Sequence, residues 1–201
     1  ATPLAGGDTA ESRSGVLADI VVLGSVPSGK AILRSGAKPG DFIYLTGDLG
    51  GASAALQALF AGEKIRPRDF PRHFDPTPRI AVGERLLGNA TAMIDLSDGL
   101  STDLTHICEE SGVGAEIEAG KIPCAQVGPK REPVPLDLAL HGGEDYELLF
   151  TVPVRKPIPA CIAGVPIHRI GRITRASGIT LVQQSGKKQK LKPAGWEHFR
   201  E

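Results

Sequence analysis

Three short stretches of the chain place glycine and acid together beside an apolar segment. They are Gly6-Gly7-Asp8-Thr9, Asp95-Leu96-Ser97-Asp98-Gly99 and Gly142-Gly143-Glu144-Asp145. Glycine lets a backbone approach a ligand closely, and the N–H groups of such turns bind phosphate oxygens. Carboxylates repel phosphate but bind it through Mg²⁺, which prefers one or two carboxylates together with phosphate oxygens. The three stretches together therefore indicate a site for a metal ion and a polyphosphate.

Each stretch taken alone also has an ordinary structural interpretation. Gly6-Gly7-Asp8 is typical of a turn. Ser97 and Asp98 are typical of a helix N-terminus, where serine caps the first turn and aspartate favours the helix dipole. Gly142-Gly143 can end a helix, with solvated acids after it. The recurrence favours a site, but it names no reaction.

Short elements separated by glycine and proline must position these residues. Apolar and β-branched runs predict strands at 16–26, 41–46, 92–94, 115–118, 146–152, 167–173 and 179–183. Apolar spacing predicts helices at 52–61, at 79–89 and from 98 to Gly112, with a helix end at 136–140. The fold class is therefore α/β, a mixed α+β sheet with helices.

Two further segments are notable for their charge. Residues 65–78 contain four prolines together with Arg66, Arg68, Arg72 and His73. This loop is either a plain linker or a segment that closes over phosphates. The basic run at 187–192 predicts a solvated edge strand whose lysines prevent pairing with other strands.

The composition narrows the class of partner. The 201 residues are 41% hydrophobic, enough for one large domain or a domain and part of another. Basic and acidic residues are equal at 23 each and aromatic residues make up 4%, so neither nucleic acid nor a membrane is expected as a partner. No stretch approaches ~20 apolar residues. The three cysteines are widely spaced, which indicates neither a disulfide framework nor a zinc site and suggests a cytoplasmic protein.

Longer stretches of the sequence resemble the thiamine-monophosphate kinase family. They are GGDT (6–9), LRSGAKPGD (33–41), TGDLG (46–50), IDLSDGL (94–100), GGEDYELLFTV (142–152), IGRI (170–173) and GWEHF (195–199). They follow the family's order with compatible spacing. The family belongs to the aminoimidazole-ribonucleotide-synthetase-like superfamily, in which an N-terminal α/β domain forms a homodimer and holds ATP, and a C-terminal α/β domain follows.

The resemblance implies a domain division and a reaction. Residues 1–27 would be the last strands of the N-terminal domain, and 28–201 the C-terminal domain. The family's earlier Asp-rich metal motifs do not precede Ala1 here, so this chain alone is not expected to catalyse. The reaction would be ATP- and Mg²⁺-dependent phosphorylation of thiamine monophosphate to thiamine diphosphate. Because the acceptor is already an ionised phosphate, the transfer would be direct and in line, with no catalytic base assigned.

Site residues follow from matching motif positions. The ligands of Mg²⁺ would be Asp8, Asp95 and Asp98. The residues in contact with ATP would be Gly7, Asp8, Arg34 and Ser97. The residues that bind thiamine monophosphate would be Glu144 and Trp196, since an aromatic face suits both a cationic thiazolium and a flat pyrimidine. The sequence departs from the family pattern at His141, where a serine is common.

Two alternatives stay open. One is another ATP-using enzyme of the superfamily, similar to selenophosphate synthetases or hydrogenase-maturation proteins. Some of those enzymes carry a C-terminal cysteine, which the tail after Trp196 lacks. The other is a non-catalytic domain that binds thiamine phosphates without turnover.

Overall fold

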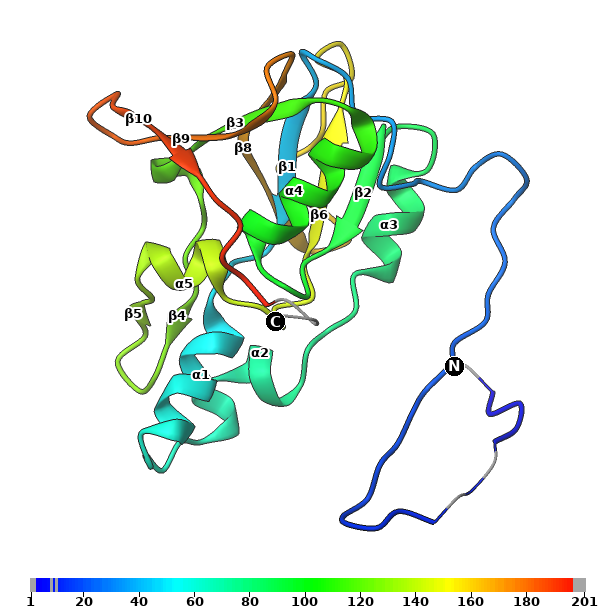
Figure 1. Ribbon diagram of the computed structural model, residues 1–201, viewed down its shortest axis with the longest axis vertical. Coiled ribbons are helices and arrows are strands. Elements are labelled where there is room, and N and C mark those ends of the chain that lie inside the picture. Colours follow the sequence, from blue (N-terminus) through cyan, green and yellow to red (C-terminus); the bar gives the residue numbers. More distant parts are fainter. Residues whose placement is uncertain (1–2, 8, 10, 197–201) are drawn as a thin grey trace.

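A mixed eight-stranded sheet forms the centre of the protein. The structure is a computed structural model that describes residues 3–7, 9 and 11–196 (Figure 1). The strands run in the order β10-β9-β3-β8-β1-β6-β2, with β7 paired to β8 outside this path. Among these neighbours only β3 and β9 are parallel. The sheet strands are β1 (Phe42–Thr46), β2 (Ala92–Asp95), β3 (Gly114–Glu118), β6 (Leu148–Val152), β7 (Cys161–Ile162), β8 (Val165–Thr174), β9 (Gly178–Val182) and β10 (Lys188–Leu191).

Helices cover both faces of this sheet, and a small hairpin lies apart from it. The helices are α1 (Gly51–Phe60), α2 (Pro71–Phe74), α3 (Ile80–Leu86), α4 (Leu100–Ser111) and α5 (Leu136–His141), with short 3₁₀ turns η1 (Pro67–Asp69) and η2 (Ala119–Lys121). The hairpin consists of β4 (Gln126–Val127) and β5 (Glu132–Pro133). In Figure 1 it lies with α1 and α2 beyond one end of the sheet. This mixed architecture confirms the predicted fold class.

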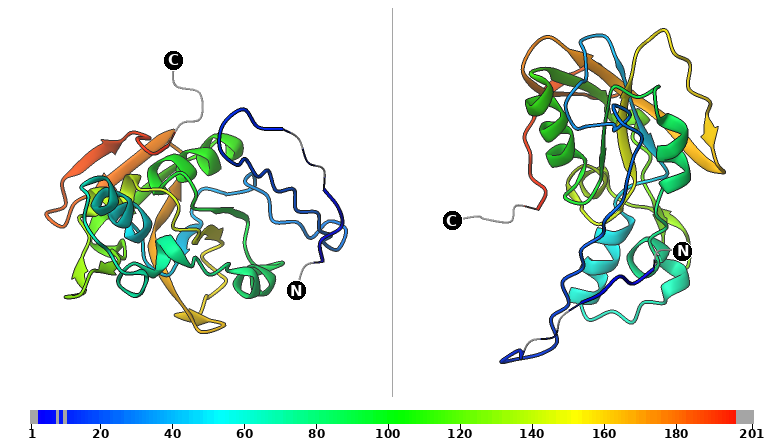
Figure 2. Two further views of the ribbon diagram at one scale, coloured as in Figure 1. Left: turned by 90° about the horizontal axis from the view of Figure 1, so that it is seen from below. Right: turned by 90° about the vertical axis from the view of Figure 1, so that its right-hand side faces the viewer.

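The apolar core divides into two layers because successive strand residues point to opposite faces. Ile43 and Leu45 of β1 belong to the larger cluster, which α4 covers. Tyr44 between them belongs to the smaller cluster with Val82 and Leu86 of α3. Figure 2 shows α4 and α3 on opposite sides of the strands. The sheet is therefore buried on both faces where it carries the site.

Helix α4 begins differently from the sequence interpretation. The residue before its first turn is Gly99, and no side-chain cap comes from that position. Instead the buried Asp103 carboxylate accepts hydrogen bonds from the N–H groups of Asp98 and Gly99, at 3.1 and 3.0 Å. Gly112 ends the helix in the left-handed conformation (φ 63°), as predicted. The capping role proposed for Ser97 is therefore wrong, and Asp103 fulfils it.

The predicted strand at 16–26 is not present. Residues 16–26 have no regular secondary structure, and apolar side chains such as Val16 and Leu17 are exposed. Figure 1 shows this segment running beside the body of the protein without joining the sheet. A strand needs a neighbour for its N–H and C=O groups, and within the described part of the chain this segment has none.

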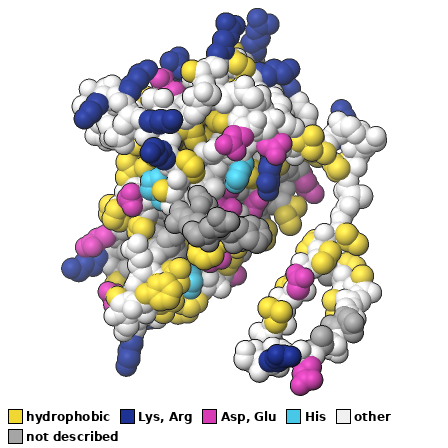
Figure 3. Space-filling model, viewed as in Figure 1, with side chains coloured by type: hydrophobic (Ala, Val, Ile, Leu, Met, Phe, Trp, Pro, Cys, Tyr) yellow, Lys and Arg dark blue, Asp and Glu magenta, His cyan; other side chains and the backbone are white. Residues whose placement is uncertain are grey.

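The edge strand predicted from the basic run is confirmed. The basic run forms β10, an exposed edge strand paired only with β9 among the described strands. Lys and Arg side chains gather at the top of the face in Figure 3, whereas acidic side chains and histidines also lie lower on that face. Within the described residues, none of the helices has the length and apolar character required to cross a membrane.

Candidate functional site

Two acidic motifs meet because β2 and β6 are antiparallel neighbours whose hydrogen bonds continue past the strand ends. The N–H of Leu96 donates to the carbonyl of Glu147 at 2.8 Å, and the N–H of Tyr146 donates to the carbonyl of Leu96 at 2.9 Å. The N–H of Glu144 then donates to the carbonyl of Ser97 at 2.9 Å. Segments far apart in sequence are thus held side by side.

Glycine is required where these two turns touch. A Cβ on Gly143 would overlap the carbonyl oxygen of Ser97. A Cβ on Gly99, whose φ is 108°, would lie 2.8 Å from the carbonyl oxygen of His141. Any larger residue would therefore push the turns apart or strain the backbone.

The turn before β6 is strained in a way that is typical of functional sites. Glu144 has a φ of 67° and Tyr146 a φ of 51°. Only four non-glycine residues of the described chain have positive φ, and these are two of them. Side chains rarely adopt this conformation, and it persists where the surroundings enforce it. Here the hydrogen bonds to the β2 end supply that enforcement.

The C-terminal segment is fixed onto the start of α4. Successive N–H groups of Ala194, Gly195 and Trp196 donate to the Ser101 hydroxyl (3.3 Å), the Thr102 hydroxyl (3.1 Å) and the Asp98 carbonyl (3.0 Å), respectively. This close approach places Trp196 next to the two turns while leaving 66% of its surface exposed.

These segments enclose a pocket of about 530 Å³. Four of the predicted site residues line it together: Ser97, Asp98, Glu144 and Trp196. The rest of its wall comes from α1, from the end of α5 and from the turn before β6, namely Ala52, Ser53, Leu56, His141, Gly142, Gly143 and Tyr146. One pocket therefore combines carboxylates with aromatic and aliphatic surface.

The local field in this pocket is negative. The pKa of Tyr146 is raised, first by burial and then by the carboxylates of Glu144, Asp95 and Asp98. Asp95 itself is exposed at the end of β2. Three predicted site acids thus act on one phenol, and their negative charges favour a cation in this region.

A group of possible metal-ligand side chains lies at the start of α4, and Asp95, the other predicted ligand of this motif, is not part of it. Ligand atoms of Asp98, Asp103 and His106 all lie within 4.8 Å of one another. Burial raises the pKa of Asp103 to about 7, while hydrogen bonds from the Asp98 and Gly99 N–H groups oppose the shift. Mg²⁺ prefers oxygen ligands, and the carboxylates of Asp98 and its buried neighbour Asp103 provide them.

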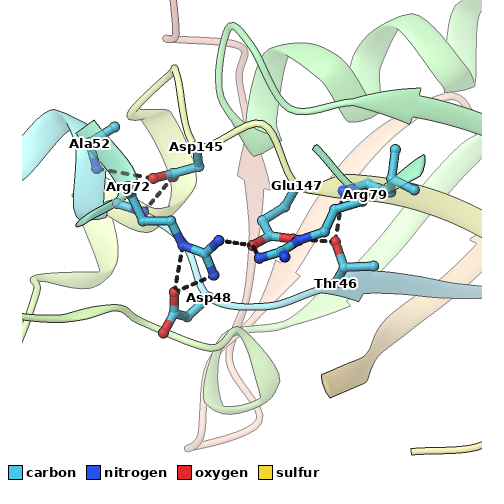
Figure 4. Close-up of polar contacts among 9 residues, drawn as sticks. Thr46, Asp48, Ala52, Arg72, Arg79, Asp145 and Glu147 are labelled. Carbon is cyan, nitrogen blue, oxygen red and sulfur yellow. Dashed lines mark hydrogen bonds and ion pairs between the residues drawn. The ribbon is translucent and has the colours of Figure 1, made fainter. Parts of the chain in front are cut away.

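Two acids of the motif at 142–152, Asp145 and Glu147, are buried, and the sequence analysis did not identify them as functional. Glu147 is 0% exposed and accepts two hydrogen bonds of 2.7 Å from Arg79 (Figure 4). It also pairs with Arg72 at 2.6 Å and accepts a hydrogen bond from the Thr46 hydroxyl. Arg72 in turn binds Asp48, at 3.1 Å. Glu147 therefore attaches the loop at 65–78 to the sheet, and Arg72 is engaged in ion pairs.

Asp145 holds the first turn of α1. Its carboxylate accepts the N–H groups of Gly50 at 2.6 Å and Ala52 at 3.1 Å (Figure 4). Burial raises the pKa of Asp145 to about 6, although these two hydrogen bonds and Arg72 lower it. The expectation that acids after Gly143 are solvated is wrong for Asp145. The signal in the sequence was the alternation with period two, which buries Asp145 and Glu147 on the side opposite Glu144.

The structure does not bring the other predicted ATP residues to this pocket. The carbonyl of Arg34 accepts a hydrogen bond from the Ser111 hydroxyl (3.4 Å), at the C-terminal end of α4. The pocket lies at the other end of this 12-residue helix, about 18 Å away at 1.5 Å per residue. Gly7 lies in an exposed segment, where a Cβ added to it would meet no atom within 4 Å. Asp8 lies outside the described residues.

Comparison with known proteins identifies the family. The family model of AIR synthase related protein, C-terminal domain, matches residues 38–183. The chain belongs to this family. It is also 40% identical to the thiamine-monophosphate kinase of Escherichia coli (strain K12) over 211 residues, which covers 98% of this chain and 63% of that protein. The chain thus spans less than two thirds of the relative's length, and the resemblance inferred from the motifs is confirmed.

Solved structures give the same result for the fold. A structure described as AaThiL complexed with AMPPCP and TMP matches with a TM-score of 0.69 and 35% identity, covering 84% of this chain and 54% of that one. The hydrogenase maturation protein HypE matches with a TM-score of 0.65 but only 18% identity, covering 88% and 59%. The second likeness shows a shared fold alone.

Proposed function

We propose that this chain supplies the thiamine-binding side of an ATP- and Mg²⁺-dependent thiamine-monophosphate kinase. The observation that carries the proposal is the convergence of Ser97, Asp98, Glu144 and Trp196 on one pocket. The kinase relatives and the solved complex with AMPPCP and TMP support it. The hydrogenase-maturation alternative has only a likeness of fold behind it.

The pocket suits both rings of thiamine monophosphate. Trp196 and Tyr146 offer aromatic faces, and Leu56 extends the apolar wall. Glu144 and Asp98 add negative charge beside them. A cationic thiazolium ring is stabilised by both features, and a flat pyrimidine packs on the apolar wall. In this account Glu144 and Trp196 are the main substrate contacts.

Catalysis would rest on positioning and charge neutralisation. The acceptor is a phosphate oxygen that is ionised at neutral pH, so no side chain has to remove a proton. Asp95 and Asp98 would hold Mg²⁺, which neutralises phosphate charge when bound. The Ser97 hydroxyl would contact ATP from the same turn, keeping the two phosphates in line.

The remaining ATP contacts would come from outside this pocket. We keep Gly7, Asp8 and Arg34 as proposed ATP or metal residues, with residues 1–27 belonging to an N-terminal domain and 28–201 to the C-terminal one. In this account the complete protein is a cytoplasmic homodimer in which ATP lies between the domains. Arg34 would then reach its ligand across that boundary and not through the pocket at the start of α4.

Turnover by a complete protein carrying this sequence tests the metal role. Asp95→Asn and Asp98→Asn should each lower kcat by about 100-fold, because each removes a ligand of the transferred charge. Glu110→Gln, at an exposed position at the C-terminal end of α4, is the control. Near-normal turnover in both site variants would refute the metal role.

A binding measurement separates a kinase from a domain that only binds thiamine phosphates. Calorimetry of the 201-residue chain with thiamine monophosphate, with and without Mg-ATP, should show binding in both cases. In the complete protein the same ligands should yield thiamine diphosphate. Binding without any turnover there would favour the non-catalytic alternative.

A further inference from the structure

His141 ends α5, lines the pocket, and is held from behind by α4. Its Nδ1 lies 2.8 Å from the hydroxyl oxygen of Ser101, a residue that is 0% exposed. That same oxygen accepts the N–H of Ala194, at 3.3 Å. The imidazole is therefore fixed to the segment that carries Trp196.

These contacts assign the proton on the neutral ring. A buried hydroxyl must donate its hydrogen to an acceptor. For Ser101, among the described residues, the available acceptor in hydrogen-bond range is His141 Nδ1, because the other close contact is an N–H donor. Nδ1 therefore accepts, and the neutral imidazole carries its proton on Nε2.

The Nε2–H group is left available to a ligand. Its nearest acidic neighbour, the carboxylate of Asp137, lies 3.8 Å away, which is too long for a hydrogen bond. Asp137 is also 85% exposed, so it can turn to solvent when a ligand arrives. The His141 side chain is 21% exposed, and His141 is one of the residues that line the pocket.

We infer that His141 determines specificity by donating a hydrogen bond from Nε2 to a ring nitrogen of the aminopyrimidine of thiamine monophosphate. The Glu144 carboxylate, on the same wall, accepts from the adjacent exocyclic amine. The inference rests on the proposed function and goes beyond it, since it names which ring edge the pocket reads. The family's common serine at this position has a shorter side chain, so the contact is a property of this chain.

The pairing predicts discrimination between two ring edges. An aminopyrimidine presents a nitrogen acceptor beside an amine donor, which matches a histidine donor beside a carboxylate acceptor. The 4′-oxo analogue presents an N–H donor beside a carbonyl acceptor, so both contacts face like groups. Buried polar groups left without partners lower affinity strongly. The wild-type chain should therefore bind the amino form about 100-fold more tightly than the oxo form.

Calorimetry with both ligands tests the inference. His141→Ala should weaken thiamine monophosphate about tenfold and leave the 4′-oxo analogue unchanged or tighter, so that discrimination falls by at least about tenfold. His141→Gln keeps an N–H donor, so it should recover most of the affinity for thiamine monophosphate. Its amide carbonyl can also turn to accept from the 4′-oxo analogue, which should bind this variant more tightly than wild type. His168→Gln, a half-buried histidine on β8, is the matched control and should behave as wild type.

The outcomes separate this inference from the proposed function. If wild type binds thiamine monophosphate and His141→Ala weakens both ligands equally, or neither, His141 is only structural and the inference is overturned while the function stands. If wild type does not bind thiamine monophosphate, both fail. Ser101→Ala should also reduce discrimination, because it frees the ring to move its proton to Nδ1. Unchanged discrimination in that variant would contradict the proton assignment.

Discussion

Glu144 and Glu147 lie three residues apart in one motif, yet the protein treats them in opposite ways. Glu144 is exposed, sits on a backbone with positive φ and lines a pocket. Glu147 is 0% exposed and bound by Arg72, Arg79 and Thr46. Glu144 thus has surface to offer a ligand, whereas Glu147 has its oxygens occupied by the protein.

The comparison shows that the contacts an acid makes within the protein, and not its residue type, distinguish a ligand-binding acid from a structural one. Buried carboxylates must be paired to remain charged. An acid held on a strained, exposed backbone gains nothing for stability and is explained by a ligand. The segment before β6 therefore stabilises the fold through Glu147 and offers a ligand-binding side chain at Glu144.

The largest effect should come from replacing the buried Glu147, and it should appear in stability. Glu147→Gln leaves two arginines beside an uncharged buried amide, which should lower the free energy of unfolding by about 3–5 kcal/mol. Denaturant unfolding measures this, with Glu144→Gln as the matched variant, expected within about 0.5 kcal/mol of wild type. A similar change in both variants would remove the contrast between the two glutamates.

The burial of Asp145 should make the stability of the protein depend on pH. Since its pKa is raised from the ordinary 3.8 to about 6, the folded chain binds this proton more tightly than the unfolded chain. Its contribution to stability is fully present below pH 3.8 and is lost as pH rises through about 6. Asp145→Asn removes this titration, so the variant should gain about 2–3 kcal/mol relative to wild type between about pH 4 and pH 7.

The comparison for this pH effect is the exposed acid Asp137. Asp137→Asn should follow wild type across the same range, because its side chain is 85% exposed. Urea unfolding at several pH values provides the measurement. A constant difference between Asp145→Asn and wild type across that range would argue against a raised pKa for Asp145.

Replacing the exposed Glu144 should change ligand binding and not stability. Glu144→Gln removes one carboxylate from the pocket and should weaken thiamine monophosphate about tenfold, as expected for a hydrogen bond to a charged group. Calorimetry at neutral pH tests it. Unaltered affinity with normal folding would show that Glu144 does not face the ligand.

The smallest effect concerns the aromatic wall. Trp196→Leu keeps apolar surface but loses the face that favours a cation, so affinity should fall about fivefold. Neutral aromatic probes of similar size should lose less. Equal losses for cationic and neutral ligands would limit Trp196 to packing.

Much of the fold followed from local signals. Apolar runs located β1 and β2, apolar helical spacing located α4, and Gly112 ended that helix as expected. The strand predicted at 16–26 failed because pairing, and not composition, makes a strand, and no neighbour lies beside it among the described residues. Local pattern specifies a candidate strand but not its partner.

The site was predictable only where its residues lie in local motifs. Ser97, Asp98, Glu144 and Trp196 came from motifs, and the pairing of β2 with β6 brings them together. The buried roles of Asp145 and Glu147 depend on Gly50, Ala52, Arg72 and Arg79, far away in sequence. The alternation with period two separates Asp145 and Glu147 from Glu144, but no local rule names the distant partners that each buried acid finds.

The single tryptophan of the chain offers the most direct test of the pocket, because Trp196 lines it. Thiamine monophosphate should change the tryptophan fluorescence saturably, after correction for its absorbance with free tryptophan amide. The midpoint should rise about tenfold in Glu144→Gln and stay unchanged in Glu110→Gln, an exposed position at the C-terminal end of α4. A fluorescence change that never saturates, or one that Glu144→Gln leaves unaltered, would contradict a thiamine-phosphate site between the ends of β2 and β6.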